Sequence, residues 1–295
     1  MSSLLLHGGY TLLLFVTNFA VLRALVEHAL GDATASHILL IPFVTLALLC
    51  QDRGTIFFRN KPAWLAGAVV IVPGLALVAT GRLAGGAHLV GDSLSLAAAG
   101  LVIAWIGGFL LFFGCDAARK ALFPLLFLAF AIPMPAELIE WLTRSLKTGS
   151  AKTVASLLTL TGTPYHREGF VFALPGFLIE IADGCSGIRS SIALVLTSLL
   201  ASRMFLRIAW ARALLVAATL PIAILKNGVR IVSLCLLSIH VDPEYLTGQL
   251  HHEGGVVFFL PALAMLALVM AALMRYQTLN LGGARVAGAD GTFRD

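Results

Sequence analysis

Eight apolar runs dominate the pattern of hydrophobic and polar positions along the chain, and polar or charged segments separate them. The runs cover approximately residues 10–30, 37–50, 63–81, 94–114, 120–136, 186–202, 208–240 and 254–274. A helix needs roughly 20 mostly apolar residues to cross the hydrocarbon core of a bilayer. The pattern therefore predicts an all-α membrane protein with about eight transmembrane helices.

Two of the runs depart from the length of a simple span. The second run is short, and the seventh, residues 208–240, is too long for one untilted helix. The seventh run contains Pro221 and the pair Asn227-Gly228. These residues weaken a helix, so they predict the place where the seventh helix bends or breaks.

The connection between the fifth and sixth runs, residues 137–185, is long. Residues 137–160 have the pattern of an amphipathic helix that lies in or near the membrane interface. The alternating apolar residues around Pro175-Gly176 predict a small β-hairpin that leads directly to Cys185. Irregular backbone is costly in lipid, so we expect an ordered, water-accessible recess here.

The composition agrees with a membrane protein. Of the 295 residues, 59% are apolar and 12% are charged, whereas a soluble domain carries roughly 25% charge. These values exclude a disordered chain, a collagen, a disulfide-stapled secreted fold and a soluble globule. No internal repeat is obvious, and we expect one polytopic domain over residues 1–280 with a short polar tail at 281–295.

The net charge of +5 is first a signal of topology, since Lys and Arg stay on the cytoplasmic side of a membrane. Nucleic-acid binding is not expected. The loops rich in base and the C-terminal tail contain Arg53, Arg59 and Lys61; Arg119 and Lys120; Arg203, Arg207 and Arg212; and Arg275 and Arg285. We therefore expect both termini to be cytoplasmic and residues 137–185 to be external. The first run lacks a basic leader and a clear cleavage site, so we expect it to remain as the first span.

The densest polar cluster is the sequence DGCSGIRSS, residues 183–191. Ser186 or Ser190 is placed to cap the following helix, which would put Cys185 at the helix N-terminus. The helix dipole favours a thiolate there, and Arg189, at i+4 from the cysteine, would stabilise the same anion. The alternative is a helix N-cap built from small residues for packing.

Arg230 is the second signal, because it lies inside the seventh run. A guanidinium at this depth normally faces a polar cavity or a partner. Asn227 precedes it by about one turn, on the same face. The alternatives are that Arg230 snorkels to the interface and that Lys226 pairs with a nearby carboxylate.

The third signal is His251-His252-Glu253, just before the last run and on the expected external side. Histidine can accept a proton from a thiol and return it to a leaving amine, although most exposed loop histidines have no catalytic role. A cysteine nucleophile, a histidine base and an arginine oxyanion partner at one membrane face form a set suited to acyl transfer. No CxxC pair or Cys/His metal spacing occurs, so no metal is expected.

Together these segments resemble the exosortase/archaeosortase family of multipass transpeptidases. The resemblance rests on DGCSGIRSS, NGVRIV and HHEGG in that order, and upstream on SHILLIP, FPLLFLAFAIPMP and GTPYHREGFVFALPG. It covers most of residues 36–260 and implies the catalytic residues Cys185, Arg230 and His252. His252 is preferred over His251 because the family pattern places its histidine three residues before a glycine, here Gly255.

The resemblance also implies a substrate and a location. Family members act on exported proteins that carry a C-terminal sorting signal: a short motif such as Pro-Glu-Pro, a transmembrane helix and a basic cluster. They are thought to transfer the new carboxyl end to an acceptor, which here is unknown and is either a lipid or a surface polymer. No cofactor is implied. We expect a multi-pass inner (plasma) membrane protein, surrounded by membrane lipids, with its site on the external face, where Glu180, Asp183, Arg189 and Asn227 are candidates for substrate binding.

Three other functions stay open. Ser186 within Gly184-Cys185-Ser186-Gly187 matches the short G-x-S-G pattern of a rhomboid-like serine protease. A discontinuous seventh helix with Arg230 and Lys226 would suit an anion transporter. A structural component of surface-polymer export, without catalysis, is the third.

Overall fold

The structure is a computed structural model that describes residues 2–58, 61–86, 88–182, 186–242 and 255–289. It is 81% helical and all-α apart from one small sheet, as predicted. The chain divides into two compact units, Met1–Ile139 and Glu140–Asp295, and each is described by itself. The expectation of one functional domain over residues 1–280 stays a prediction.

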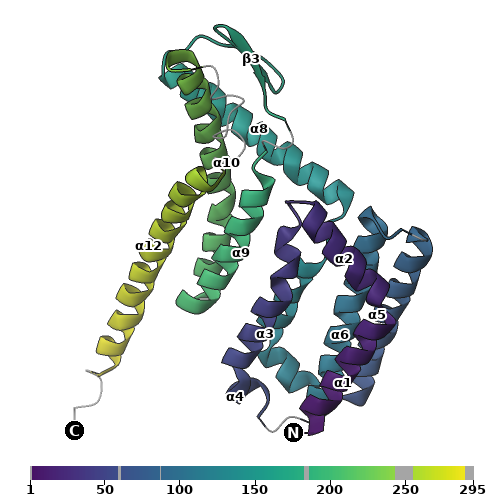
Figure 1. The fold of residues 1–295 in the computed structure, drawn as a ribbon. Coiled ribbons are helices and arrows are strands. Elements are labelled where there is room, and N and C mark those ends of the chain that lie inside the picture. Colours follow the sequence, from purple (N-terminus) through teal and green to yellow (C-terminus); the bar gives the residue numbers. More distant parts are fainter. Residues whose placement is uncertain (1, 59–60, 87, 183–185, 243–254, 290–295) are drawn as a thin grey trace. The chain divides into compact units, whose positions relative to one another are not determined.

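The first unit is built from helices only, within the residues that are described (Figure 1). In chain order these are α1 (Ser2–Thr17), α2 (Phe19–Gly31), the 3-10 helix η1 (Ser36–Leu39), α3 (Ile41–Gln51), α4 (Arg53–Ile56), α5 (Trp64–Gly85), α6 (Gly91–Lys120), α7 (Leu122–Phe127) and the 3-10 helix η2 (Leu128–Ala131). Helix α6 is the centre of this unit, because residues of α1, α2, α3, α4, α5 and α7 all contact it or share its buried clusters.

Small residues hold α5 against α6. Gly67, Gly74 and Gly81 recur every seven residues of α5, so they lie along one side of that helix. A Cβ atom added to Gly74 would lie 2.6 Å from the backbone nitrogen of Ala104 on α6. In lipid, helices associate through such close packing of small residues, because water does not drive them together.

The first apolar run is not one straight span. It forms α1 and α2, whose axes are bent by 76° at Asn18. Asn18 is buried, and its side-chain Nδ2 donates a hydrogen bond to the Leu14 carbonyl oxygen over 2.9 Å. The same carbonyl oxygen also accepts from the Asn18 backbone nitrogen over 3.2 Å, so the side-chain bond serves to pair the buried Asn18 amide at the bend.

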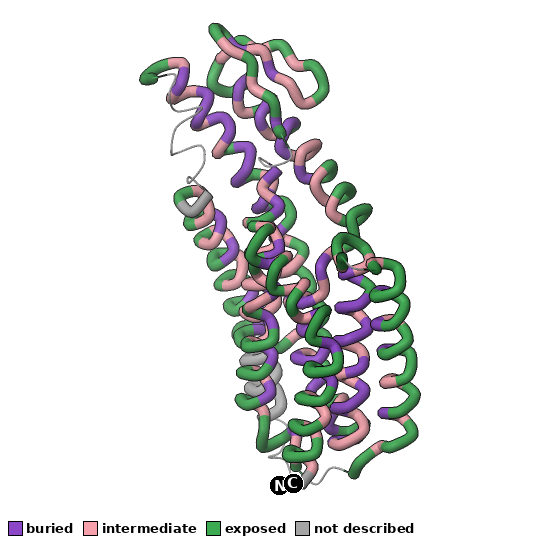
Figure 2. The backbone as a smooth tube through the Cα atoms, turned by 45° about the vertical axis from the view of Figure 1, so that its right-hand side comes forward, coloured by how far each residue is buried: buried purple, intermediate pink, exposed green. Residues whose placement is uncertain are grey.

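The second unit combines helices with the sheet. Its elements are α8 (Ala136–Leu160, which starts just before the unit boundary), β1 (His166–Glu168), β2 (Val171–Leu174), β3 (Phe177–Glu180), α9 (Ile188–Phe205), α10 (Ala209–His240) and α12 (Gly255–Ala289). Helices α9, α10 and α12 contact one another. The amphipathic helix predicted over 137–160 is confirmed as α8; its buried residues, Leu146, Ser150, Ala151, Val154 and Leu158, lie on one face. Figure 2 shows α8 with one buried and one exposed side.

The hairpin is confirmed, and it is part of a larger sheet. Strands β2 and β3 are antiparallel, with Leu174 opposite Phe177, so Pro175-Gly176 forms a two-residue turn. Gly176 has a φ of 94°, the positive value that the second position of a type II Pro-Gly turn needs. Strand β1, which the sequence analysis did not anticipate, pairs with β2 on its other side.

The expected break in the seventh run is wrong. Helix α10 has 32 residues and continues through both Pro221 and Asn227-Gly228. At about 1.5 Å per residue it is roughly 48 Å long, which exceeds the ~30 Å of a hydrocarbon core. Helix α10 is therefore tilted or extends beyond that core.

Fewer than eight helices among the described residues meet the length and composition needed to span a membrane. Within the described residues, five helices are long and apolar enough to cross a membrane, or up to seven if each bent helix pair is one span. The bent pairs are α1 with α2 and α7–η2 with α8. The second run forms the shorter apolar helix Ser36–Gln51. Each apolar run is thus helical, but the count of eight spans is not confirmed.

Candidate functional site

The second unit has a core that fixes the sheet and α10 against α8. Its buried members include Val154 and Leu158 of α8, Phe172 of β2, and Val232 and Cys235 of α10. The turn between β1 and β2 is also attached to α8, because the Lys147 ammonium lies 4.7 Å from the Phe170 ring centre. This core supports the end of β3, from which the chain continues toward Cys185.

Helices α8 and α10 approach closely through two glycines. A Cβ atom on Gly228 would lie 2.4 Å from Cγ2 of Thr153, and one on Gly149 would lie 2.7 Å from Cδ1 of Ile224. Beside these contacts, Asn227 Nδ2 of α10 donates a hydrogen bond to Ser150 Oγ of α8 over 3.0 Å. The pair Asn227-Gly228 is therefore a packing feature of an unbroken helix.

The N-terminus of α9 is formed by Gly187. Its φ of 78° and ψ of 13° are left-handed values, which favour glycine, and no side chain caps the helix. The expectation that Ser186 or Ser190 caps α9 is wrong. The hydroxyls of Ser190 and Ser191 instead donate back to the Gly187 carbonyl oxygen, each over 2.9 Å.

Gly187 also lies directly against α10. A Cβ atom at this position would lie 3.2 Å from Oδ1 of Asn227. The turn that begins α9 and the polar part of α10 are thus in contact, and a side chain at residue 187 would require Asn227 to shift by a few tenths of an ångström.

A second contact joins the same two helices. Lys226 is 6% exposed, and its Nζ donates a short hydrogen bond to Ser190 Oγ. Among the described residues, no carboxylate lies within ion-pair distance of Lys226. The alternative that Lys226 pairs with a carboxylate finds no support in the described part of the chain, where a neutral hydroxyl is its partner.

The structure describes four of the seven residues that the sequence analysis selected. Arg230 is half-buried on α10, one turn after Lys226, and Asn227 is buried beside it. Arg189, in the first turn of α9, and Glu180, at the end of β3, are exposed. The remaining three, Asp183, Cys185 and His252, lie outside the described residues, as does His251.

Ser186, the nucleophile of the rhomboid-like alternative, is described. Its side chain is 1% exposed, and its buried Oγ has no hydrogen-bond partner in the described structure. A hydroxyl that attacks a substrate needs a base within hydrogen-bond distance and access to the substrate. The described surroundings of Ser186 offer neither.

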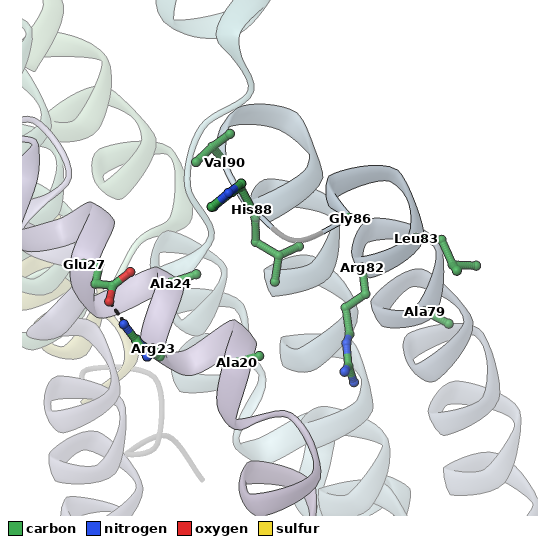
Figure 3. Close-up of a pocket in the computed structure, with 11 residues that line it drawn as sticks. Ala20, Arg23, Ala24, Glu27, Ala79, Arg82, Leu83, Gly86, His88 and Val90 are labelled. Carbon is green, nitrogen blue, oxygen red and sulfur yellow. Dashed lines mark hydrogen bonds and ion pairs between the residues drawn. The ribbon is translucent and has the colours of Figure 1, made fainter.

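A cavity of about 810 Å³ lies in the first unit, lined by residues of α2, α5 and the segment that joins α5 to α6. Figure 3 shows the ion pair on its α2 side, where Arg23 Nε and Glu27 Oε1 are 2.7 Å apart. Arg82 and His88 line it from the other side. None of the residues selected from the sequence lines this cavity.

Comparison with models of protein families shows which family the chain belongs to. The model of the family described as Transmembrane exosortase (Exosortase_EpsH) matches residues 29–268. The chain belongs to the transmembrane exosortase family. It is thus an integral multi-pass membrane protein of a family of membrane-embedded sorting enzymes, which are known as transpeptidases. No curated protein and no solved structure gives a significant match.

Sequence reasoning missed the side chains that contact Asn227 and Lys226. Ser150 carries no signal of its own, because it is one of several small polar residues on an amphipathic helix. Ser190 was considered only as a helix cap, whereas it binds Lys226. The i, i+4 spacing of Lys226 and Arg230 was available from the sequence and indicated a common polar face on α10.

Proposed function

We propose that this chain is a membrane-embedded cysteine transpeptidase that cleaves the C-terminal sorting signals of exported proteins. Its catalytic residues would be Cys185, Arg230 and His252. One observation carries the proposal: the family match spans residues 29–268, a range that contains Cys185, Arg230 and His252. The acceptor of the cleaved chain would be a lipid or a surface polymer at the external membrane face.

The described contacts support this assignment. The turn at Gly187, two residues after Cys185 in the chain, lies against Asn227 of α10, and Ser190 accepts a hydrogen bond from Lys226. Arg230 follows one turn later on α10. The start of α9, which follows Cys185 in the chain, and the helix that bears the Arg230 guanidinium are therefore packed together, which supports a shared reaction centre.

The reaction follows from these residue types. The Cys185 thiolate attacks the scissile carbonyl carbon, and the carbonyl oxygen becomes an oxyanion that Arg230 stabilises. The C–N bond then breaks, and the leaving amine takes a proton from His252, which leaves a thioester on Cys185. The acceptor gives its proton to His252, attacks the thioester carbonyl and expels the Cys185 thiolate.

The residues around this centre would bind the signal peptide. Arg189 is exposed and positive, which suits contact with the acidic residue of a motif such as Pro-Glu-Pro, and the exposed Glu180 suits contact with the basic cluster of the signal. Asp183 precedes the cysteine by two residues. Asn227 is buried, so its contribution would come through the turn at Gly187.

The experiment is co-expression of the chain with a model substrate that carries a tripartite tail. We expect a size shift with the wild type and with Ser186→Ala, and none with Cys185→Ala. Mass spectrometry of the shifted product would then identify the acceptor. Cleavage by Cys185→Ala would contradict the proposed mechanism, and loss of cleavage in Ser186→Ala alone would favour the serine protease.

The transporter alternative depended on a discontinuous seventh helix. Helix α10 is continuous through Asn227-Gly228, so that argument is absent. A structural role without catalysis predicts no processing of the substrate in any variant. The same co-expression experiment therefore separates these functions from the transpeptidase.

A further inference from the structure

A groove in the first unit lies between α2 and α5. Both helices pack on α6, and between them lies the cavity of about 810 Å³, lined by α2, α5 and the segment before α6. This volume is within the roughly 300–1,000 Å³ of sites that bind small molecules. Ala20 of α2 and Ala79, Arg82 and Leu83 of α5 line the groove and are exposed, so within the first unit the groove is open at its side.

Helix α5 places Arg82 at the level of lipid headgroups. The helix is long and apolar enough to span a membrane. Its 22 residues measure roughly 33 Å, close to the ~30 Å of a hydrocarbon core. The exposed Trp64 begins α5, as is common at a membrane interface, and Arg82 lies in its last turn. The two ends of α5 therefore lie at the two membrane surfaces, and Arg82 is near the phosphate groups of one leaflet.

The groove carries more positive than negative charge. Its acidic lining residue, Glu27, is paired with Arg23 over 2.7 Å. Arg82 and His88 lie across the groove from this pair (Figure 3). Among the described residues, no carboxylate lies within ion-pair distance of Arg82. Asp92, at the start of α6, accepts a hydrogen bond over 3.0 Å from the backbone nitrogen that begins α8. The groove therefore favours an anion beside Arg82.

An apolar surface adjoins these charges. Ala79 lies three residues before Arg82, so it is on the same side of α5 and about 4.5 Å deeper in the membrane. Ala20 has the same spacing from Arg23 on α2, and Leu83 and Leu89 complete the apolar lining. The small alanine side chains leave room between the helices. The groove thus combines a basic end with an apolar part, which matches the two parts of a phospholipid.

We propose that this groove binds an anionic phospholipid, with Arg82 on the phosphate and an acyl chain along Ala79 and Ala20. A guanidinium donates two parallel hydrogen bonds to a phosphate, and basic pockets between transmembrane helices bind the headgroups of anionic lipids in this way. A zwitterionic lipid has the same phosphate, but the surplus positive charge repels its ammonium group. The inference goes beyond the proposed function, since lipid binding does not require the chain to cleave a substrate.

The test is photo-crosslinking of the purified full-length protein in phosphatidylcholine vesicles. The vesicles contain a small fraction of phosphatidylglycerol with a photoactivatable group in one acyl chain, and mass spectrometry identifies the crosslinked peptides. We expect labelling of the α2 and α5 peptides that line the groove. Arg82→Gln should lower this labelling about tenfold at limiting lipid, because a hydrogen bond between charged groups is lost. Arg53→Gln is the matched control, since Arg53 is exposed on α4 and outside the groove, and its labelling should equal that of the wild type.

Ala79→Phe is the second variant, and it carries the test if Arg82→Gln does not fold. It fills the apolar part of the groove without a change of charge, so it should also lower the labelling. Unchanged labelling in folded Arg82→Gln, or in Ala79→Phe if it alone folds, would overturn the proposal. An equal loss of labelling in Arg53→Gln would also overturn it, because net charge would then be the cause. So would equal labelling by photoactivatable phosphatidylcholine, since the groove would then not select an anionic lipid.

Discussion

Asn227 on α10 donates a hydrogen bond from Nδ2 to Ser150 Oγ on α8 over 3.0 Å, and both side chains are buried. Buried polar groups are costly unless they are paired, so this bond fixes the two helices at one position along their length. The Gly187 turn lies against the same asparagine. Asn227 therefore contacts both α8 and the start of α9, so the packing of α8 against α10 also determines where α9 begins relative to α10.

The first prediction concerns this hydrogen bond. Asn227→Ala and Ser150→Ala each leave a buried group without its partner, so each should lower the free energy of unfolding by about 1–3 kcal/mol. The double variant should cost less than the sum of the two, because the unpaired group is then absent. Unfolding in detergent micelles titrated with SDS measures all three values.

The matched control for this prediction is Ser156→Ala. Ser156 is also on α8, but its side chain is exposed and bonds only to its own helix, at the Lys152 carbonyl oxygen. Its free energy of unfolding should change by less than about 0.5 kcal/mol. Additive losses in the double variant would show that the two side chains do not act together.

The second prediction concerns the turn before α9. Gly187→Ala places a Cβ atom on a residue with a φ of 78° and 3.2 Å from Asn227 Oδ1. Gly162→Ala is the control, since Gly162 has a φ of 68° and no atom within 4 Å of its added Cβ. Both variants pay about 1–2 kcal/mol of backbone strain. Only Gly187→Ala should also reduce substrate cleavage, because only its added Cβ atom meets α10. If Gly162→Ala reduced stability and cleavage as much as Gly187→Ala does, the close contact with α10 would be contradicted.

The positions of the helices could be predicted from the sequence, because backbone in lipid must pair its own polar groups and an apolar run does so by forming a helix. The hairpin was also predictable, since alternating apolar residues flank Pro175-Gly176. The bend at Asn18 was not. It lies at a buried asparagine whose side chain bonds to the Leu14 carbonyl, and a run of apolar residues around a single asparagine does not show whether the backbone stays straight.

The site shows the same limit at Asn227-Gly228. In sequence the pair has low helix propensity, which predicts a break. In the structure the glycine gives room for Thr153 and the asparagine bonds to Ser150, so packing with α8 outweighs propensity. Both partners are on a segment about 75 residues earlier, and no local pattern could indicate them. For the same reason, the bond between Lys226 and Ser190 could not be predicted.

The third prediction tests the packing of α5 against α6. Gly74→Ala places a Cβ atom 2.6 Å from the Ala104 backbone nitrogen and 2.9 Å from the Gly100 carbonyl oxygen. Neither atom can turn away, so the helices must separate, at a cost of about 1–3 kcal/mol. The control is Gly54→Ala on α4, where nothing lies within 4 Å of the added Cβ. The unfolding midpoint in micelles should fall for Gly74→Ala only, and a fall for both would indicate a general effect of the added methyl groups.

The fourth prediction concerns Arg230. If it stabilises the oxyanion, Arg230→Gln should slow processing of the model substrate by about 10²–10³-fold, because a positive hydrogen-bond donor is lost from the transition state. Arg230→Lys keeps the charge but not the two-pronged donor geometry, so it should retain more of the rate than the glutamine variant. The measurement is the fraction of substrate processed over time, compared at equal amounts of folded enzyme.

Lys152→Gln is the control for Arg230, because it removes one positive charge from an exposed position on α8. Its processing rate should equal that of the wild type, which separates a local role from an effect of net charge. The pH midpoint of Cys185 alkylation by iodoacetamide then distinguishes the two roles that Arg230 can have. If it serves only the oxyanion, Arg230→Gln leaves the midpoint of alkylation unchanged, because that charge develops only when substrate is present. If Arg230 also stabilises the thiolate, Arg230→Gln raises the pH midpoint of alkylation in addition to slowing the processing of the substrate.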